Sequence, residues 1–464
     1  MKKISEEVIS RLNSIVGSGN VLTTQEDMEP YSHDELPTLK FMPDVVVKPR
    51  TSKEIAGIMK LANELEISVT PRGLGTGLSG GALPIHGGIV ISLERMNEIL
   101  EIDEANMVAV IEPGVIVGDL NKAVEEQGLF YPPDPASLDS CSIGGNIAHN
   151  AGGARAVKYG ITRNYVLGLE VVLPTGEIIR HGGKFVKNVS GYNLTQYFIG
   201  SEGTLGIVTK IILKLVPLPQ YSVDLLVPFN DFHQAAEVVT KIMGEKRIIP
   251  VVLEFMDKAG VQACETFLGR ELPFSNAEAQ LIIGLDGNDK DELDKLIEVI
   301  GEICFENDAE DVLVADSKFA KDSLWEARRI LLETLKAISD QVEVEDVVVP
   351  RSRIPDLISM TTRLSEEYGL PIVNWGHAGD GNVHVAILKK DIDENTWNEK
   401  FEGLVQAIFD GVVEMGGTIT GEHGVGYLKK KYLPKVVGET EIALMKKIKN
   451  ALDPKNILNP EKIF

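Results

Sequence analysis

Hydrophobic and polar positions follow two different patterns, one before and one after Pro219. Up to Pro219, short apolar runs separate glycine-rich stretches, and residues 206–216 predict a strand that ends at Pro217-Leu-Pro219. Beyond that point strand-like and helical periods alternate, which is typical of an antiparallel sheet covered by helices. The sequence therefore predicts an α+β protein with domains over residues 1–219 and 220–415 and a short helical segment over residues 416–464.

The first region begins with a helix and a small β-α-β unit. Thr51 and Glu54 have the spacing of a capping box, which starts a helix over residues 55–65. Other elements predicted here are strands over 43–48, 67–70, 88–93, 107–111 and 167–173 and a helix over 117–127. In the second region we expect strands over 222–227, 249–255 and 280–285, helices over 231–243, 289–305 and 317–339, and a last helix over 440–452.

Composition limits the class of protein. At 464 residues, with 44% apolar and 25% charged residues, the chain is globular and too long for one core. A formal charge of −23 argues against nucleic acid as a partner, because its phosphates would be repelled. No stretch has the ~20 uninterrupted apolar residues that a membrane span needs, so we predict a cytoplasmic protein. Cys141, Cys264 and Cys304 lack C-x-x-C spacing, which excludes an iron–sulfur or zinc–cysteine site built from this chain alone.

Three of the 8 histidines lie in two short stretches. The first reads Asn-Trp-Gly-His-Ala-Gly-Asp-Gly-Asn-Val-His-Val, in which Ala-Gly-Asp-Gly between apolar flanks predicts a hairpin. If residues 378–381 form its loop, His377 pairs with Asn382, and His384 lies diagonally on the same face, roughly 7–8 Å away. Both imidazoles could then reach one divalent ion, with Glu422 as a third ligand and positions left open for a substrate.

His423 follows Glu422 and suits a proton transfer. Two histidines and a carboxylate accept Zn²⁺, Fe²⁺ or Mn²⁺. The alternative is that these are ordinary polar residues lining a turn and a helix start. The concentration of histidines favours the ligand interpretation.

The densest glycine cluster, residues 71–81, matches G-x-G-x-x-G at Gly75, Gly77 and Gly80. A Rossmann fingerprint must open a helix, and Pro84 with the strand-like segment after it interrupts any helix here. Glycines instead allow consecutive amides to point at one anionic group, such as a pyrophosphate. With two more glycine-rich stretches, 142–153 and 200–206, the sequence predicts a large dinucleotide held in an extended pose.

Together these motifs resemble the FAD-linked oxidases and dehydrogenases of the vanillyl-alcohol oxidase type. Within that family the chain is most similar to the branch of glycolate oxidase catalytic subunits and D-lactate and D-2-hydroxyacid dehydrogenases. The resemblance covers essentially the whole chain, and its carriers are residues 71–81, 131–135, 142–153, 191–209, 376–384, 421–424 and 457–460.

The resemblance implies a PCMH-type FAD-binding domain of two α+β subdomains, an α+β cap domain with the substrate site, and a C-terminal segment that returns to the flavin site. Since the pyrophosphate loop has neither His nor Cys, we expect non-covalent FAD. The cofactor-binding residues implied are Pro71, Arg72, Gly73, Gly75, Thr76, Gly77, Leu78, Ser79, Pro135, Ser142, Gly145, Asn146, Asn150, Gly152, Gly153, Gly206, Ile207 and Val208.

The resemblance also implies a divalent metal at His377, His384 and Glu422, and the proton acceptor at His423. The metal would bind the hydroxyl and carboxylate oxygens of a 2-hydroxy acid, and His423 would take the hydroxyl proton while the C2 hydride passes to flavin N5. Arg328 matches the arginine that binds the substrate carboxylate bidentately. The alternative for Arg328 is a surface helix residue.

The chain departs from the 2-hydroxyglutarate members of the family at three positions. Leu332 and Val344 stand where they carry Thr and Lys, and Ala386 replaces an amide residue. Fewer polar contacts predict a small monoacid substrate, D-lactate first, over a diacid.

Three functions follow from these motifs. The preferred one is a flavin- and metal-dependent D-2-hydroxyacid dehydrogenase acting on D-lactate. The alternatives are a D-2-hydroxyglutarate or glycolate dehydrogenase and, in another class, a non-catalytic electron-relay flavoprotein subunit that would not need the histidines. With no NAD-binding unit or cluster cysteines visible, we expect electrons to pass to a separate redox partner, such as an electron-transfer flavoprotein, an iron–sulfur subunit or a quinone.

Overall fold

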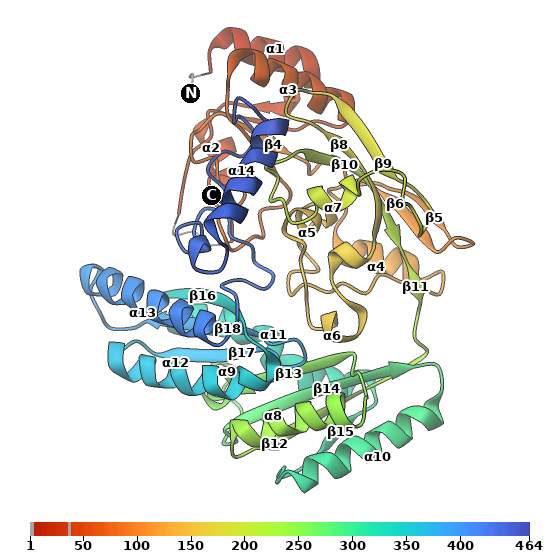
Figure 1. Ribbon diagram of the computed structural model, residues 1–464, viewed down its shortest axis with the longest axis vertical. Coiled ribbons are helices and arrows are strands. Elements are labelled where there is room, and N and C mark those ends of the chain that lie inside the picture. The colour runs from red at the N-terminus through yellow and green to blue at the C-terminus, as the bar shows by residue number, and fades with distance from the viewer. Residues whose placement is uncertain (1–3, 36–38) are drawn as a thin grey trace. The chain divides into compact units, whose positions relative to one another are not determined.

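The structure is a computed structural model that describes residues 4–35 and 39–464 (Figure 1). The chain divides into two compact units. The first unit comprises Met1–Gly152, Ile161–Leu218 and Glu422–Phe464, and the second comprises Gly153–Gly160 and Pro219–Gly421. Each mixes helices with largely antiparallel sheet, which confirms the predicted α+β class. The domain ranges 1–219, 220–415 and 416–464 stay a prediction.

The first unit contains two main sheets. The smaller has the strand order β1 (Val21–Leu22), β2 (Val45–Val47), β4 (Ile89–Ser92) and β3 (Val69–Arg72). The larger is antiparallel, in the order β5 (Ile99–Asp103), β6 (Val108–Ile111), β10 (Ile207–Lys214), β8 (Val166–Val172) and β9 (Ile178–Gly182). A separate pair joins β7 (Leu129–Phe130) to β11 (Val216–Pro217). The predicted β-α-β unit is present, but β2 and β3 each pair in parallel with β4, which lies between them.

Helix α3 (Ser52–Leu65) follows Thr51, its N-cap, as the capping box predicts, but starts three residues before the predicted range 55–65. Thr51 Oγ1 accepts a hydrogen bond from Glu54 N at 3.2 Å, while the Glu54 carboxylate accepts from Arg50 N at 2.6 Å. The apolar face of α3 packs with α1 and the parallel strands in one core. The other helices of this unit are α1 (Glu6–Val16), α2 (Gln25–Met28), α4 (Val117–Glu125), α5 (Ile143–His149), α7 (Leu194–Phe198) and α14 (Glu439–Leu452).

The C-terminal residues complete this core. Ile457 and Leu458 are buried in it, and Val69 N of β3 donates to Ile457 O at 2.8 Å. Lys462 is 2% exposed, and its ammonium donates to Leu83 O at 2.8 Å. The end of the chain is therefore part of the folded unit.

The second unit is built on one seven-stranded antiparallel sheet. Its strand order is β15 (Leu313–Ala315), β12 (Tyr221–Phe229), β14 (Ala279–Gly287), β13 (Val252–Asp257), β17 (Ile372–His377), β18 (Asn382–Lys389) and β16 (Gln341–Val348). Two helices, α9 (Lys258–Leu268) and α11 (Lys318–Ile338), pack on one face through Val261, Leu331, Trp375 and Ala386.

The opposite face is covered by four helices, of which α12 and α13 lie side by side in Figure 1. These are α8 (Phe232–Thr240), α10 (Lys290–Glu306), α12 (Ile354–Tyr368) and α13 (Glu394–Glu414), and α6 (Ala156–Tyr159) also belongs to this unit. The helix predicted over residues 231–243 ends at Thr240 and continues as a π-helical turn, Lys241–Glu245. No helix in the described part of the chain is long and apolar enough to cross a membrane.

Burial lowers the pKa of Lys462 from 10.5 to about 8, against the attraction of acids such as Glu202. Because the pKa of Lys462 in the folded protein is below its value of ~10.4 in the unfolded chain, the unfolded chain binds more protons than the folded protein between pH 8 and 10. The free energy of unfolding should therefore rise with pH across this window, by about 2 kcal/mol relative to Lys462→Met. Urea unfolding of both proteins at pH 7 to 10 measures the difference. Lys455→Met, at an exposed lysine, should instead follow the wild-type curve, and parallel curves for wild type and Lys462→Met would contradict the prediction.

Candidate active site

The hairpin of β17 and β18 places two histidines on one face of the sheet. His377 pairs with Asn382 and Trp375 with His384, which confirms the register predicted from the sequence. The two imidazole centroids are 5.4 Å apart, and both side chains are buried. Gly381 in the loop has φ +87°, and a Cβ there would meet Val349 O at 1.9 Å, so the turn requires glycine.

Glu254 on β13 lies beside His377. Its carboxylate is fully buried, contacts His377 Nδ1 through Oε1, and accepts from Arg328 Nε at 2.7 Å through Oε2. Burial alone would raise the pKa of Glu254, but the neighbouring His377 and Arg328 outweigh it and lower that pKa below its usual range. Glu254 is therefore held as a carboxylate.

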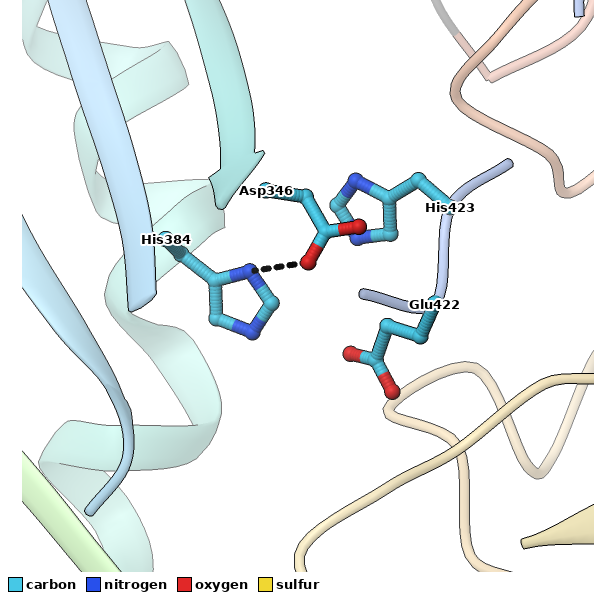
Figure 2. Close-up of side chains that lie close together, drawn as sticks. All are labelled: Asp346, His384, Glu422 and His423. Carbon is cyan, nitrogen blue, oxygen red and sulfur yellow. Dashed lines mark ion pairs between the residues drawn. The ribbon is translucent and has the colours of Figure 1, made fainter. Parts of the chain in front are cut away.

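Asp346 on β16 lies directly across from His384 and is also fully buried. It accepts hydrogen bonds from Asn382 Nδ2 at 2.6 Å, Thr420 Oγ1 at 2.9 Å and Gly421 N at 2.9 Å. Its Oδ1 is 3.8 Å from His384 Nδ1, the contact dashed in Figure 2. Asp346 thus joins the hairpin to the chain segment that precedes Glu422.

Glu422 and His423 follow Gly421 directly, so the anchoring of Gly421 on Asp346 fixes where they begin. Figure 2 shows both side chains with Asp346 and His384, and one ligand atom from each of the four lies within 4.8 Å of the others. His377 is not one of these four; it adjoins them through its ring contact with His384.

The sequence analysis missed two buried acids of this site, Glu254 and Asp346. For Asp346 the available signal was its place next to an apolar run, because Val347-Val-Val349 follows it and Val344 stands two residues before it. Such an acid in a buried strand needs a partner, but the sequence does not show which strand lies opposite.

Arg328 on α11 is 13% exposed at its side chain, so the alternative of a surface helix residue is wrong. Its Nε and Nη2 both contact Glu254 Oε2, each at 2.7 Å. Ala386 lies in the core beneath α11, and Val344 packs against that core. The face around the two histidines is therefore polar at one end of the strands and apolar at the other.

In the first unit, residues 73–81 follow β3 without opening a helix, as the rejection of a Rossmann motif requires. A Cβ on Gly73 would lie 2.5 Å from Ser142 Oγ, so the loop runs against the start of α5. The Arg72 guanidinium donates to the carbonyl oxygens of His33 and Pro30, at 2.7 and 3.0 Å, and braces the N-terminal lead-in.

The glycine-rich stretch 142–153 contains helix α5, which the sequence analysis did not predict. Ser142 Oγ caps it by accepting from Gly145 N at 3.3 Å. Glycine is needed at 144 because a Cβ would lie 2.6 Å from Pro113, so here glycine serves close packing of a helix. Asn150 ends the helix in the left-handed region, with φ +56°.

The other residues expected at the cofactor differ in how far their side chains are buried. Ile207 is buried in the hydrophobic core, and a Cβ on Gly206 would lie 2.5 Å from Val171. Beside them Val208 is half-buried, as is Pro135. A Cβ on Gly152 would lie 2.7 Å from Glu422 Oε2, and Gly153 belongs to the second unit. At Gly206 and Ile207, therefore, only the backbone could contact the cofactor.

The glycine loop and helix α5 beside it retain unused polar groups that suit a bound nucleotide. Ser79 Oγ and His149 Nδ1 are buried and have no hydrogen-bond partner among the described residues. The loop itself is fixed, because Ser79 O accepts from Tyr427 N at 2.9 Å and Leu428 N at 3.2 Å. A rigid glycine loop with a spare hydroxyl fits the phosphates of FAD.

Comparison with known proteins shows which family the chain belongs to. Residues 43–182 match the FAD binding domain, and residues 218–463 match the C-terminal domain of FAD linked oxidases. The glycolate oxidase subunit GlcD of Bacillus subtilis (strain 168) is 44% identical over 99% of this chain and 97% of its own. The D-lactate dehydrogenase of Anaerostipes hadrus is 40% identical over 99% of this chain and 98% of its own.

Solved structures show the same fold at low identity. p-Cresol methylhydroxylase with substrate bound superposes with a TM-score of 0.81 at 19% identity, over 98% of this chain and 96% of its own. An alkyldihydroxyacetonephosphate synthase superposes with a TM-score of 0.77 at 21% identity, over 99% of this chain and 86% of its own. The two family matches define the class as an FAD-linked oxidoreductase. The chain belongs to the FAD-linked oxidases, in the group that includes glycolate oxidase subunits and D-lactate dehydrogenases.

Ser79→Ala tests the phosphate site. Because Ser79 Oγ makes no hydrogen bond within the described protein, its loss should leave the free energy of unfolding of the FAD-free protein unchanged. The dissociation constant of FAD should rise about tenfold, the effect of one lost hydrogen bond to a charged group. Flavin fluorescence titration of the FAD-free protein measures it, with Ser10→Ala on α1 as the control. Unchanged FAD affinity would place Ser79 outside the cofactor site.

Proposed function

We propose that this FAD-linked oxidoreductase is a metal-assisted D-2-hydroxyacid dehydrogenase that oxidises D-lactate, or a similarly small monoacid, to the 2-oxo acid. The observation that carries the proposal is the gathering of His384, Glu422 and His423 beside His377. A flavoprotein that only relays electrons would not need these groups. The similarity to a D-lactate dehydrogenase and a glycolate oxidase subunit supports the same substrate class.

The donor set fits a divalent metal. His377, His384 and Glu422 offer two imidazoles and one carboxylate, which suit Zn²⁺, Fe²⁺ or Mn²⁺ and leave positions for substrate oxygens. When bound, FAD supplies the two-electron acceptor and the metal supplies a Lewis acid that favours the deprotonated substrate hydroxyl.

His423 acts as the base in this proposal. It would accept the proton of the C2 hydroxyl at an imidazole nitrogen, so that the oxidation releases this proton to the protein and the C2 hydrogen, as a hydride with its two electrons, to the cofactor. Its place after Glu422 keeps it next to the oxygen atoms that the metal site would hold.

Arg328 binds the substrate carboxylate. Nε and Nη2 contact Glu254, which fixes the plane of the guanidinium and leaves the Nη1 side to face a second carboxylate. Val344 and Ala386, both packed in or against the apolar core, provide no polar contact for a second carboxylate on the substrate. A monoacid is therefore favoured over 2-hydroxyglutarate.

The FAD is non-covalent, and its electrons pass to a separate redox partner. Cys141, which lies next to the capping Ser142, is buried, and that burial raises the pKa of its thiol, which disfavours the nucleophilic thiolate. One relative is named as a subunit of glycolate oxidase, which favours a partner subunit or an electron-transfer flavoprotein as acceptor.

Anaerobic titration of the FAD- and metal-loaded protein tests the substrate. D-lactate should bleach the flavin absorbance near 450 nm, glycolate less efficiently, and L-lactate and D-2-hydroxyglutarate little. Chelation before titration should abolish the bleaching. Bleaching by the diacid alone would contradict the role given to Val344 and Ala386, and no bleaching by any of these acids would favour an electron-relay subunit.

Variants of the two histidines separate base from ligand. His423→Ala should slow flavin reduction by ~10²-fold or more while the metal content stays at the wild-type level. In contrast, His384→Ala should lose the metal itself. Metal analysis and stopped-flow reduction measure both, with His233→Ala, at an exposed histidine of α8, as the control. If His423→Ala loses the metal as His384→Ala does, His423 is a ligand and the base lies elsewhere.

A further inference from the structure

Four adjacent strands of the second unit carry an acid, two histidines and an acid in spatial order. The strands are β13, β17, β18 and β16. Glu254 pairs with His377 across the first two, and His384 pairs with Asp346 across the last two. The histidines therefore occupy the two central strands, and each has its own buried carboxylate on the outer side.

We propose that Glu254 and Asp346 are positioning residues that fix the tautomer and ring orientation of the two histidines, so that both present Nε2 to one metal ion. The inference rests on the metal site of the proposed function. Glu254 contacts Nδ1 of His377, and Asp346 Oδ1 faces Nδ1 of His384 at 3.8 Å. A carboxylate on the Nδ1 side favours the proton there and leaves the lone pair on Nε2, which is how metal-binding imidazoles are commonly oriented.

Glu254 holds two groups at once. One oxygen contacts His377 Nδ1 and the other contacts Arg328, and all three side chains are mostly or fully buried. A buried carboxylate between two cationic or potentially cationic groups has no freedom to turn without leaving one of them unpaired. Glu254 therefore ties the position of a metal-binding histidine to that of the arginine that binds the substrate carboxylate.

Asp346 is placed among the possible metal ligands by distance, but its oxygens are already engaged. Oδ1 accepts from Asn382, and Oδ2 accepts from both Thr420 and Gly421. A carboxylate offers about four lone-pair sites, and three of them take these hydrogen bonds, while His384 Nδ1 faces Oδ1 at 3.8 Å. Asp346 is therefore assigned to orient His384 and not to bind the metal.

The bonds from Thr420 and Gly421 give Asp346 a second task. They fix the backbone immediately before Glu422 and His423, and this backbone also bridges β16 at Thr418 and Thr420. The two acids thus have different partners besides the histidines. Glu254 binds Arg328, and Asp346 binds the segment that leads to Glu422 and His423.

The test uses Glu254→Gln and Asp346→Asn in the full-length FAD-loaded protein. Two controls remove an acid nearby without touching a histidine: Glu278→Gln at the surface, and Glu343→Gln, which points to the opposite face of β16. Co²⁺ affinity is measured by competition with a chelator, and the Co²⁺ absorption spectrum reports the ligand geometry. Thermal unfolding of the metal-free proteins checks the fold.

Both variants should bind Co²⁺ 10- to 100-fold more weakly and with an altered spectrum, the effect typical of removing the partner of a ligating histidine. Glu254→Gln should also raise KM for D-lactate, through Arg328. Asp346→Asn should instead lower kcat with little change in KM, through His423. If Glu254→Gln does not fold, Glu254→Asp, which keeps the charge, should fold and show an intermediate loss of affinity.

Wild-type affinity and spectrum in both variants would overturn the inference while leaving the proposed function intact. A wild-type protein that binds no Co²⁺ or other divalent ion would remove the metal from the proposed function, and the inference would fall with it. A loss of affinity in the control variants equal to that in Glu254→Gln would show a general effect of charge, which also overturns the positioning role.

Discussion

The antiparallel pairing of β17 with β18 is the constraint on which the candidate active site depends. Side chains alternate between the faces of a strand, so a one-residue shift of this register would turn His384 to the opposite face. The loop fixes the register, because Gly381 passes so close to Val349 O that no side chain fits there. With the hairpin set, the neighbouring strands β13 and β16 determine what each histidine contacts.

Burying this many ionisable groups on one sheet face requires compensation. Glu254 and Asp346 are fully buried, and an isolated carboxylate in such a place is strongly disfavoured. Each is offset by several partners, among them Arg328 for Glu254 and the amide of Gly421 for Asp346. The site is therefore stable only as a set, and removal of one member leaves a buried charge unpaired.

In the first unit, hydrogen bonds to the backbone fix the segment that follows His423. Glu202 accepts from Val425 N and Gly426 N, at 2.8 and 2.7 Å, while Ser79 O accepts from the two residues that follow. The segment after His423 is thus held against the glycine loop. As a result, the residues that carry the Glu-His motif continue directly into those that brace the expected phosphate site.

Local patterns determined much of this protein from the sequence alone. The turn residues between apolar flanks predicted the hairpin and its register, and Pro84 excluded a Rossmann helix after the glycine loop. Both predictions depend only on residues that are close in the chain. The helix at 143–149 was missed because glycine disfavours helices locally, while its close packing on Pro113 is a tertiary contact. The family resemblance supplied Arg328, but not the partner that orients it.

What only the tertiary structure decided is the order of strands in the sheet. Glu254 and His377 are 123 residues apart, and Asp346 and Asn382 are 36 apart, so no periodicity in the sequence connects them. They meet because β13 and β16 add to opposite sides of the hairpin. Side-chain type and spacing therefore determined which residues could bind a metal, and sheet topology decided which buried acids hold them, because strand neighbours are chosen by the packing of the whole unit.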